Sequence, residues 1–175
     1  MKPSLCNQLI GTFEAPQNAK MHIRENRLTA VHLLSDRKDN PFVPYTSELY
    51  EVITSSVERY KKELEITHWP KKYGLEPPKM KRYFVGGEDR FDDHVDVDSG
   101  ANASRFLVCF IYLSDNRKGS TVINPSTPDE TDMYISRALR GSIVLFPPYW
   151  PWVHKGEAPV DAPKYIIGSY LHYVE

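Results

Sequence analysis

The sequence predicts a mainly β protein, a sandwich or barrel with helical structure near its N-terminus, and three observations support this. Aromatic residues make up 12% of the chain, and it contains 11 tyrosines and 14 prolines, which suits short strands joined by defined turns. One amphipathic segment occurs early in the chain. Apolar, β-forming runs follow it without alternating helices, and that order favours a sandwich or barrel.

The clearest helix is predicted over residues 47–66. Apolar side chains recur there at helical spacing while charged side chains occupy the other face, and Pro70 closes the region. The apolar positions are Leu49, Val52, Ile53, Val57, Tyr60 and Leu64. We expect this helix to pack on a sheet and assign it no chemistry.

From Met80 onward the pattern changes to strands and turns. Phe106 to Leu113 is a continuous run of apolar β-formers, as expected for a strand that is buried on both faces. Further strands are predicted at Gly141 to Phe146, Trp152 to His154 and Lys164 to Tyr173.

Length and composition exclude several classes of protein. A chain of 175 residues fits one domain with its own core, and its net charge of −1 indicates no general affinity for polyanions. Cys6 and Cys109 are too few for a disulfide framework or a cysteine-based zinc site. The longest apolar run is far too short for a membrane span, and no secretory signal is visible, so we expect a cytoplasmic protein.

His94 and Asp96 are the first candidate metal ligands. Alternate residues of a strand project to the same side, so both side chains are able to face one ion. The pair alone means little, because a chain of this composition contains about one such pair by chance. His154 follows a dense aromatic and proline stretch, where a buried core histidine is the alternative. Two imidazoles and one carboxylate form the facial triad that holds Fe(II) and leaves three coordination positions open.

Lys164 is the next candidate. In a hairpin centred on Pro159, positions 154 and 164 would be cross-strand neighbours that face the same side. A lysine there is costly to bury unless it meets an anion, and a surface lysine that reaches out to water is the alternative.

Further elements occur in order around these residues. They are Tyr83, His94-Val95-Asp96, Arg105 followed by Tyr112-Leu113, Gly141 followed by Phe146-Pro147, His154-Lys155-Gly156, and Pro163-Lys164-Tyr165. In this order they resemble the Fe(II)/2-oxoglutarate-dependent dioxygenases, most closely the prolyl 4-hydroxylase-like branch, in which lysine is typical at position 164. The resemblance covers residues 80–173, about half of the chain.

The resemblance implies a double-stranded β-helix, a jelly-roll or cupin-like barrel. Residues 80–175 would form its catalytic core and residues 1–79 a helix-containing support within a single domain, 1–175. The implied cofactors are Fe(II), 2-oxoglutarate as co-substrate and O2, with ascorbate as an optional reductant. The implied reaction hydroxylates a C–H bond, foremost in a prolyl residue of a peptide or protein, and releases succinate and CO2.

The resemblance also implies a role for each candidate residue. His94, Asp96 and His154 would hold the iron, and Lys164 with Tyr83 would bind the distal carboxylate of 2-oxoglutarate. Arg105 is a candidate for substrate contact by its position in the family, and an ion pair at the start of a strand is the alternative. We expect residues 115–140 to form an irregular loop that acts as a lid or rim over the site.

Three positions depart from the family pattern. Tyr83 stands eleven residues before His94, more than usual, so Gly86-Gly87 is predicted to mark a bulge or a longer turn. Phe91 stands where the family often has tyrosine, and Tyr170 where an active-site tryptophan is frequent. These changes affect the expected substrate more than the expected chemistry.

Three other functions are compatible with parts of the sequence. A nucleic-acid dealkylase of the same superfamily is disfavoured, because that pattern places paired arginines after the last histidine and only Lys155 and Lys164 are basic there. A small-molecule dioxygenase keeps the same iron chemistry. A non-catalytic cupin-like binding module is the third alternative, although no ligand of the constellation is missing. The sequence indicates no membrane partner and leaves the oligomeric state open.

Overall fold

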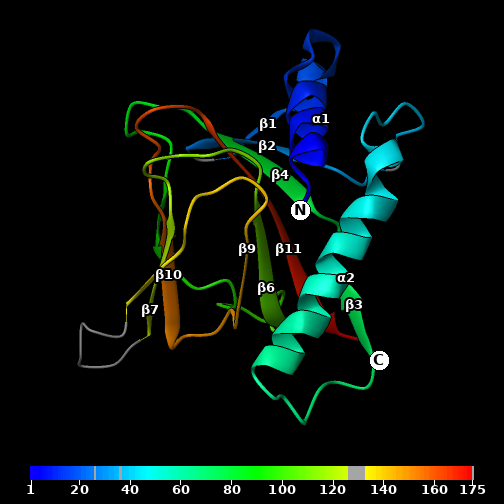
Figure 1. Ribbon diagram of the computed structural model, residues 1–175, viewed down its shortest axis with the longest axis vertical. Coiled ribbons are helices and arrows are strands. Elements are labelled where there is room, and N and C mark those ends of the chain that lie inside the picture. Colours follow the sequence, from blue (N-terminus) through cyan, green and yellow to red (C-terminus); the bar gives the residue numbers. More distant parts are fainter. Residues whose placement is uncertain (26, 36, 126–132, 175) are drawn as a thin grey trace.

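The computed structural model describes residues 1–25, 27–35, 37–125 and 133–174, and two antiparallel sheets dominate it (Figure 1). The larger sheet has the strand order β1-β2-β4-β11-β6-β9, and β3 pairs with the far end of β11. The smaller sheet has the order β5-β10-β7-β8. Two sheets of this kind form the predicted jelly-roll, or double-stranded β-helix.

The elements have the following bounds. The helical ones are α1 (Pro3–Glu14), η1 (Pro16–Met21), η2 (Val43–Tyr45) and α2 (Thr46–Glu63). The strands of the larger sheet are β1 (Ile23–Glu25), β2 (Leu28–His32), β3 (Tyr73–Leu75), β4 (Lys79–Tyr83), β6 (Arg105–Tyr112), β9 (Ile143–Phe146) and β11 (Lys164–Tyr173). Those of the smaller sheet are β5 (Phe91–His94), β7 (Thr121–Pro125), β8 (Tyr134–Ile135) and β10 (Trp152–Gly156).

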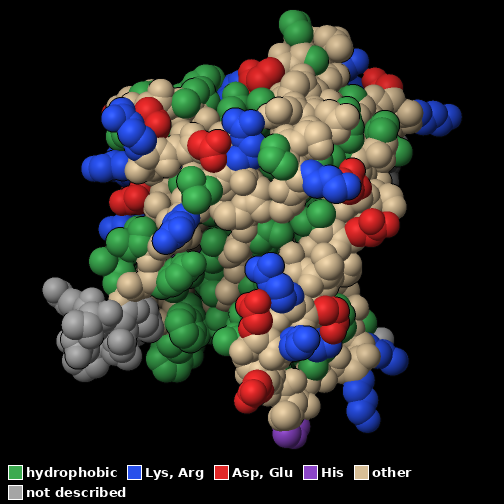
Figure 2. Space-filling view, in the orientation of Figure 1, with side chains coloured by type: hydrophobic (Ala, Val, Ile, Leu, Met, Phe, Trp, Pro, Cys, Tyr) green, Lys and Arg blue, Asp and Glu red, His purple; other side chains and the backbone are tan. Residues whose placement is uncertain are grey.

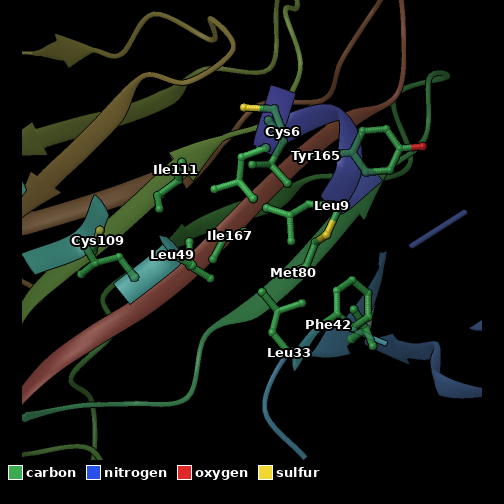
Figure 3. Close-up of a cluster of buried hydrophobic side chains, with 14 of the residues drawn as sticks. Cys6, Leu9, Leu33, Phe42, Leu49, Met80, Cys109, Ile111, Tyr165 and Ile167 are labelled. Atoms are coloured by element: carbon green, nitrogen blue, oxygen red, sulfur yellow. The ribbon is translucent and has the colours of Figure 1, made fainter. Parts of the chain in front are cut away.

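Strand β6 is apolar throughout because both of its faces are buried. Leu107, Cys109 and Ile111 point to a core that the larger sheet shares with α1 and α2 (Figure 3). Val108 and Phe110 point the other way, into the core between the two sheets. A strand covered on both faces has no exposed side, so the alternation of polar and apolar residues disappears.

The helices α1 and α2 cover the outer face of the larger sheet, opposite the smaller sheet (Figure 1). Leu9 of α1 and Ile53 of α2 are each about 1% exposed or less, and both pack into the core that contains Ile167 of β11. The prediction of a helix over 47–66 is confirmed, except that α2 ends at Glu63; Glu65 just beyond it has a positive φ of 50°. The helix therefore stops where the backbone leaves the right-handed region.

Two sequence expectations are wrong. Strands β10 and β11 do not form a hairpin, because β10 pairs with β5 and β7 whereas β11 pairs with β3, β4 and β6. The segment from 115 to 140 is not an irregular loop, since it contains β7 and β8. Its residues 126–132 lie outside the described part of the chain, so a lid there is not described.

The surface shows no single dominant charge on the face drawn in Figure 2, where Lys and Arg side chains are interspersed with Asp and Glu. Among the described residues, no helix combines the length and the apolar character needed to cross a bilayer.

Candidate metal and co-substrate site

His94, Asp96 and His154 come together at one end of the space between the sheets. His154 lies on β10 directly opposite His94, the last residue of β5. Asp96 follows the end of that strand, where the backbone N–H groups of Asp96 and Val97 both donate to the carbonyl of Pro148. The expected strand alternation therefore stops at His94, and a turn instead of a strand positions the carboxylate.

The three side chains offer ligand atoms to a single point. Nε2 of His154 lies 3.2 Å from Oδ2 of Asp96, and Nε2 of His94 lies 3.5 Å from Oδ1. One ligand atom from each residue falls within 4.8 Å of the others. An ion about 2.1 Å from each of its ligands brings them to separations of this order.

Hydrogen bonds fix the orientation of both imidazoles. Nδ1 of His94 lies 2.8 Å from the carbonyl of Asp92, and Nδ1 of His154 lies 3.1 Å from the carbonyl of Trp152. Because a carbonyl only accepts, each Nδ1 carries the proton, and each Nε2 presents a lone pair to Asp96. Backbone carbonyls orient metal-binding histidines in this way in many proteins.

The same arrangement leaves polar atoms without partners. Oδ2 of Asp96 and Nε2 of His154 are buried and make no hydrogen bond. Burial raises the pKa of Asp96, but the neighbouring imidazoles of His154 and His94 outweigh burial and hold this pKa well below its usual range. A carboxylate and an imidazole lone pair that face each other in a buried site fit a cation between them.

Lys164 is completely buried beside these ligands, at 0% exposure. Its ammonium makes no hydrogen bond and lies 4.7 Å from the ring centre of Tyr83 and 5.7 Å from that of Tyr112. Burial lowers the pKa of Lys164 to about 7. An unpaired ammonium in an aromatic pocket fits an anionic ligand, since burial without a partner is costly.

Tyr83 and Lys164 are cross-strand partners of β4 and β11. Together with His94, Asp96 and His154 they line one small cavity of about 20 Å³. The structure thus brings together five of the six predicted site residues, although Lys164 arrives from the other sheet and not from a hairpin with His154. The turn that carries β4 into β5 contains Gly86 and Gly87, whose φ angles of 126° and 85° suit glycine.

Arg105 is held by protein groups. Its guanidinium makes two hydrogen bonds with Glu76, at 2.6 and 2.8 Å, and a third with the carbonyl of Asp96 at 3.3 Å. It also stacks on Tyr170, with 3.8 Å to the ring centre. The ion pair considered as an alternative from the sequence is therefore present, and Arg105 lies in the wall of a larger groove of about 480 Å³.

Three residues of the site were not predicted in their structural roles. Tyr170 donates a hydrogen bond to Asp96, Phe91 packs against His94 with tilted rings whose centres are 4.2 Å apart, and Lys81 lies over Phe91. Tyr170 and Phe91 stood out only as departures from a family pattern. The sequence contains one indication of the position of Lys81: in a strand, residues 79, 81 and 83 share a face, so Lys81 lies on the same side as Tyr83.

Comparisons with known proteins show which solved structures share this fold. No protein-family model and no curated protein matches the sequence. Among solved structures, a viral collagen prolyl hydroxylase from Paramecium bursaria Chlorella virus-1, in complex with 2-oxoglutarate, superposes with a TM-score of 0.70 at 17% identity, over 100% of this chain and 92% of that one.

Two cellular proteins are similar as well. A prolyl hydroxylase from Trichoplax adhaerens, in complex with a peptide from the oxygen degradation domain of hypoxia inducible factor, gives a TM-score of 0.69 at 14% identity, over 97% of this chain and 78% of that one. A prolyl-4-hydroxylase from Pseudomonas putida gives 0.66 at 11% identity, over 100% and 89%. The chain therefore has the fold of the prolyl 4-hydroxylase-like 2-oxoglutarate oxygenases.

Proposed function

We propose that the protein is an Fe(II)- and 2-oxoglutarate-dependent dioxygenase that hydroxylates a C–H bond of a peptide or protein, foremost in a prolyl residue. One observation carries the proposal: three buried atoms without hydrogen bonds, Oδ2 of Asp96, Nε2 of His154 and Nζ of Lys164, line a single cavity. The first two require a cation and the third requires an anion. A chelated metal with an anionic co-substrate supplies both.

In this proposal His94, Asp96 and His154 hold the iron. Three protein ligands leave positions free for a chelating co-substrate and for dioxygen. The bound iron and 2-oxoglutarate supply the oxidising chemistry, with succinate and CO2 as co-products. The carbonyls of Asp92 and Trp152 keep each Nδ1 protonated, so both imidazoles remain in the tautomer that binds metal.

Lys164 and Tyr83 are proposed to bind the distal carboxylate of 2-oxoglutarate. The ammonium of Lys164 supplies a charge-assisted hydrogen bond, and the surrounding rings exclude water from it. The cavity of about 20 Å³ has room for about one water molecule. Entry of the co-substrate therefore requires side chains of the cavity wall to move apart.

The peptide substrate is proposed to lie in the groove of about 480 Å³, which reaches the site at Asp96. The fold shared with three prolyl hydroxylases, one of them with a bound peptide, supports this choice of substrate. Arg105, predicted to contact substrate, lies in the groove wall, and its contacts with Glu76 and Tyr170 support a role in shaping that wall.

The proposal is tested by oxygen-dependent turnover. Purified protein with Fe(II) and 2-oxoglutarate is incubated with a set of prolyl peptides, and succinate release and the gain of one oxygen atom by the peptide are measured together. We expect His154→Ala to abolish both signals and His68→Ala, which alters an exposed histidine, to leave them unchanged. Succinate release that is equal in His154→Ala and the parent protein would contradict the proposed site.

A further inference from the structure

The groove beside the site contains one lysine, Lys81, whose charge no carboxylate of the described residues neutralises at ion-pair distance. Two other basic residues of the groove wall are paired. Lys79 lies 2.8 Å from Glu25, and Arg105 lies 2.6 Å from Glu76. Lys81 instead places its ammonium 5.2 Å from the ring centre of Phe91.

Strand geometry directs Lys81 toward the reaction centre. On β4, Lys79, Lys81 and Tyr83 alternate with residues that face the helices, and Tyr83 lines the inner cavity. Lys81 is paired in register with Ile166 of β11, two residues beyond Lys164. It lines both the groove and the inner cavity, and so lies where the two meet.

Phe91 connects this lysine to the metal ligands. Its ring packs against that of His94 with the centres 4.2 Å apart and the planes tilted by 45°, and the ammonium of Lys81 lies over the same ring. A group bound to Lys81 would therefore lie about one side chain away from the metal ligands. Burial lowers the pKa of Lys81, and the charges of Asp96 and Glu25, which act in the opposite direction, do not compensate for it.

We infer that Lys81 determines substrate specificity: its ammonium binds a carboxylate group of the substrate, and this carboxylate lies near the carbon that is oxidised. This inference rests on the proposed oxygenase function and names its substrate class: a carboxylate-bearing substrate, either a peptide with an acidic residue beside the target or a free amino acid. A carboxylate of the substrate would form an ion pair with Lys81, as the carboxylate of Glu25 does with Lys79. A neutral substrate would leave the ammonium without a partner.

The test uses paired ligands that differ only in charge. Acetyl-Glu-Pro-amide is compared with acetyl-Gln-Pro-amide, and free proline with prolinamide. Their binding to the protein loaded with Fe(II) and 2-oxoglutarate without oxygen is measured by calorimetry, and their stimulation of succinate release is measured in air. We expect at least one acid to bind at least about 10-fold more tightly than its amide, since a charge-assisted hydrogen bond contributes about that much. The pair that shows this difference identifies which of the two sources supplies the carboxylate.

Variants assign the effect to Lys81. Lys81→Gln is expected to abolish the preference for the acid, and Lys81→Arg to retain most of it. Lys72→Gln, the same change at an exposed lysine outside the groove, is expected to leave the ratio of acid to amide unchanged. Circular dichroism and thermal melts establish that each variant is folded.

Three outcomes would overturn the inference. They are binding of neither acid, equal binding of acid and amide, and a Lys81→Gln variant that loses affinity for 2-oxoglutarate while it keeps its preference for the acid. The last result would assign Lys81 to the co-substrate site. Binding of Fe(II) and 2-oxoglutarate is measured in the same samples, so the oxygenase proposal stands or fails separately from the assignment of Lys81.

Discussion

The hydroxyl of Tyr170 donates a hydrogen bond of 2.9 Å to Oδ1 of Asp96, so the two oxygens of this carboxylate have different surroundings. Oδ1 is occupied by a protein donor, whereas Oδ2 is buried without a hydrogen bond beside Nε2 of His154. The guanidinium of Arg105 covers the ring of Tyr170 and is itself fixed by Glu76. Of the two carboxylate oxygens, Oδ2 is therefore the one that no protein hydrogen bond occupies.

Tyr170→Phe should weaken metal binding. Loss of a hydrogen bond that orients a ligand typically costs about 10- to 100-fold in metal affinity. The measurement is a titration with Co(II) followed by the visible absorption of the bound ion. Tyr165→Phe is the control, because it removes a hydroxyl that donates to the remote Glu14 at 2.8 Å and should leave the affinity unchanged. Equal affinity in Tyr170→Phe and the parent protein would contradict the assigned role.

Lys164→Met should change stability and co-substrate binding in opposite directions. Replacing a buried ammonium that has no partner by an apolar side chain of similar length should stabilise the protein by about 1 kcal/mol or more. The same change should weaken 2-oxoglutarate binding by about 10- to 100-fold, because the charged partner of the distal carboxylate is lost. Thermal melts without co-substrate and calorimetric titration with 2-oxoglutarate measure the two effects. A destabilised variant with unchanged affinity would give Lys164 a structural role instead.

Lys164 should also make stability depend on pH. Burial lowers its pKa from 10.5 to about 7 in the folded chain, so above about pH 7 the unfolded chain binds the proton and the folded chain does not. Stability must then rise with pH between these two values, by at most about 1.4 kcal/mol per pH unit, and this group contributes no slope below them. Urea unfolding without 2-oxoglutarate measures the rise, and Lys164→Met should remove it. An identical pH profile in the parent protein and the variant would contradict this prediction.

Both cysteines should be unreactive in the native protein. Cys6 and Cys109 are 0% and 1% exposed, and burial raises the pKa of both thiols, that of Cys109 to about 12. Reaction with a thiol-specific disulfide reagent should therefore be slow under native conditions and should reach both thiols only after unfolding. Fast labelling of either thiol in the folded protein would show that the core beneath α1 opens readily.

Local pattern was sufficient to predict the elements whose sequences carry a strong period or a long apolar run. Helix α2 and strands β6 and β11 belong to this group, because one face or both faces of each are buried against neighbours. Strands β1, β2 and β3 were not predicted from the sequence. They are short, and β2 is held in the sheet because it pairs with β4, a strand that is distant from it in sequence.

The sequence named five side chains that line the inner cavity, but it did not predict all of their geometry. The triad of His94, Asp96 and His154 was recognisable from residue types and order. Lys164 does not lie in the predicted hairpin, because symmetry about Pro159 does not determine which sheet the chain enters next. The roles of Tyr170 and Lys81 were not predicted, because they depend on contacts from the larger sheet to Asp96 and Phe91 at the smaller sheet, which a linear pattern does not contain.

We propose that Fe(II) and 2-oxoglutarate bind in one and the same cavity. The most direct test is an anaerobic titration of the metal-free protein with Fe(II) and 2-oxoglutarate, in which the visible metal-to-ligand charge-transfer band is recorded. We predict that the band forms with the parent protein, disappears with His154→Ala, and needs a higher concentration of 2-oxoglutarate with Lys164→Ala. Absence of the band at saturating iron and 2-oxoglutarate would contradict the oxygenase function and leave a binding protein with the same fold.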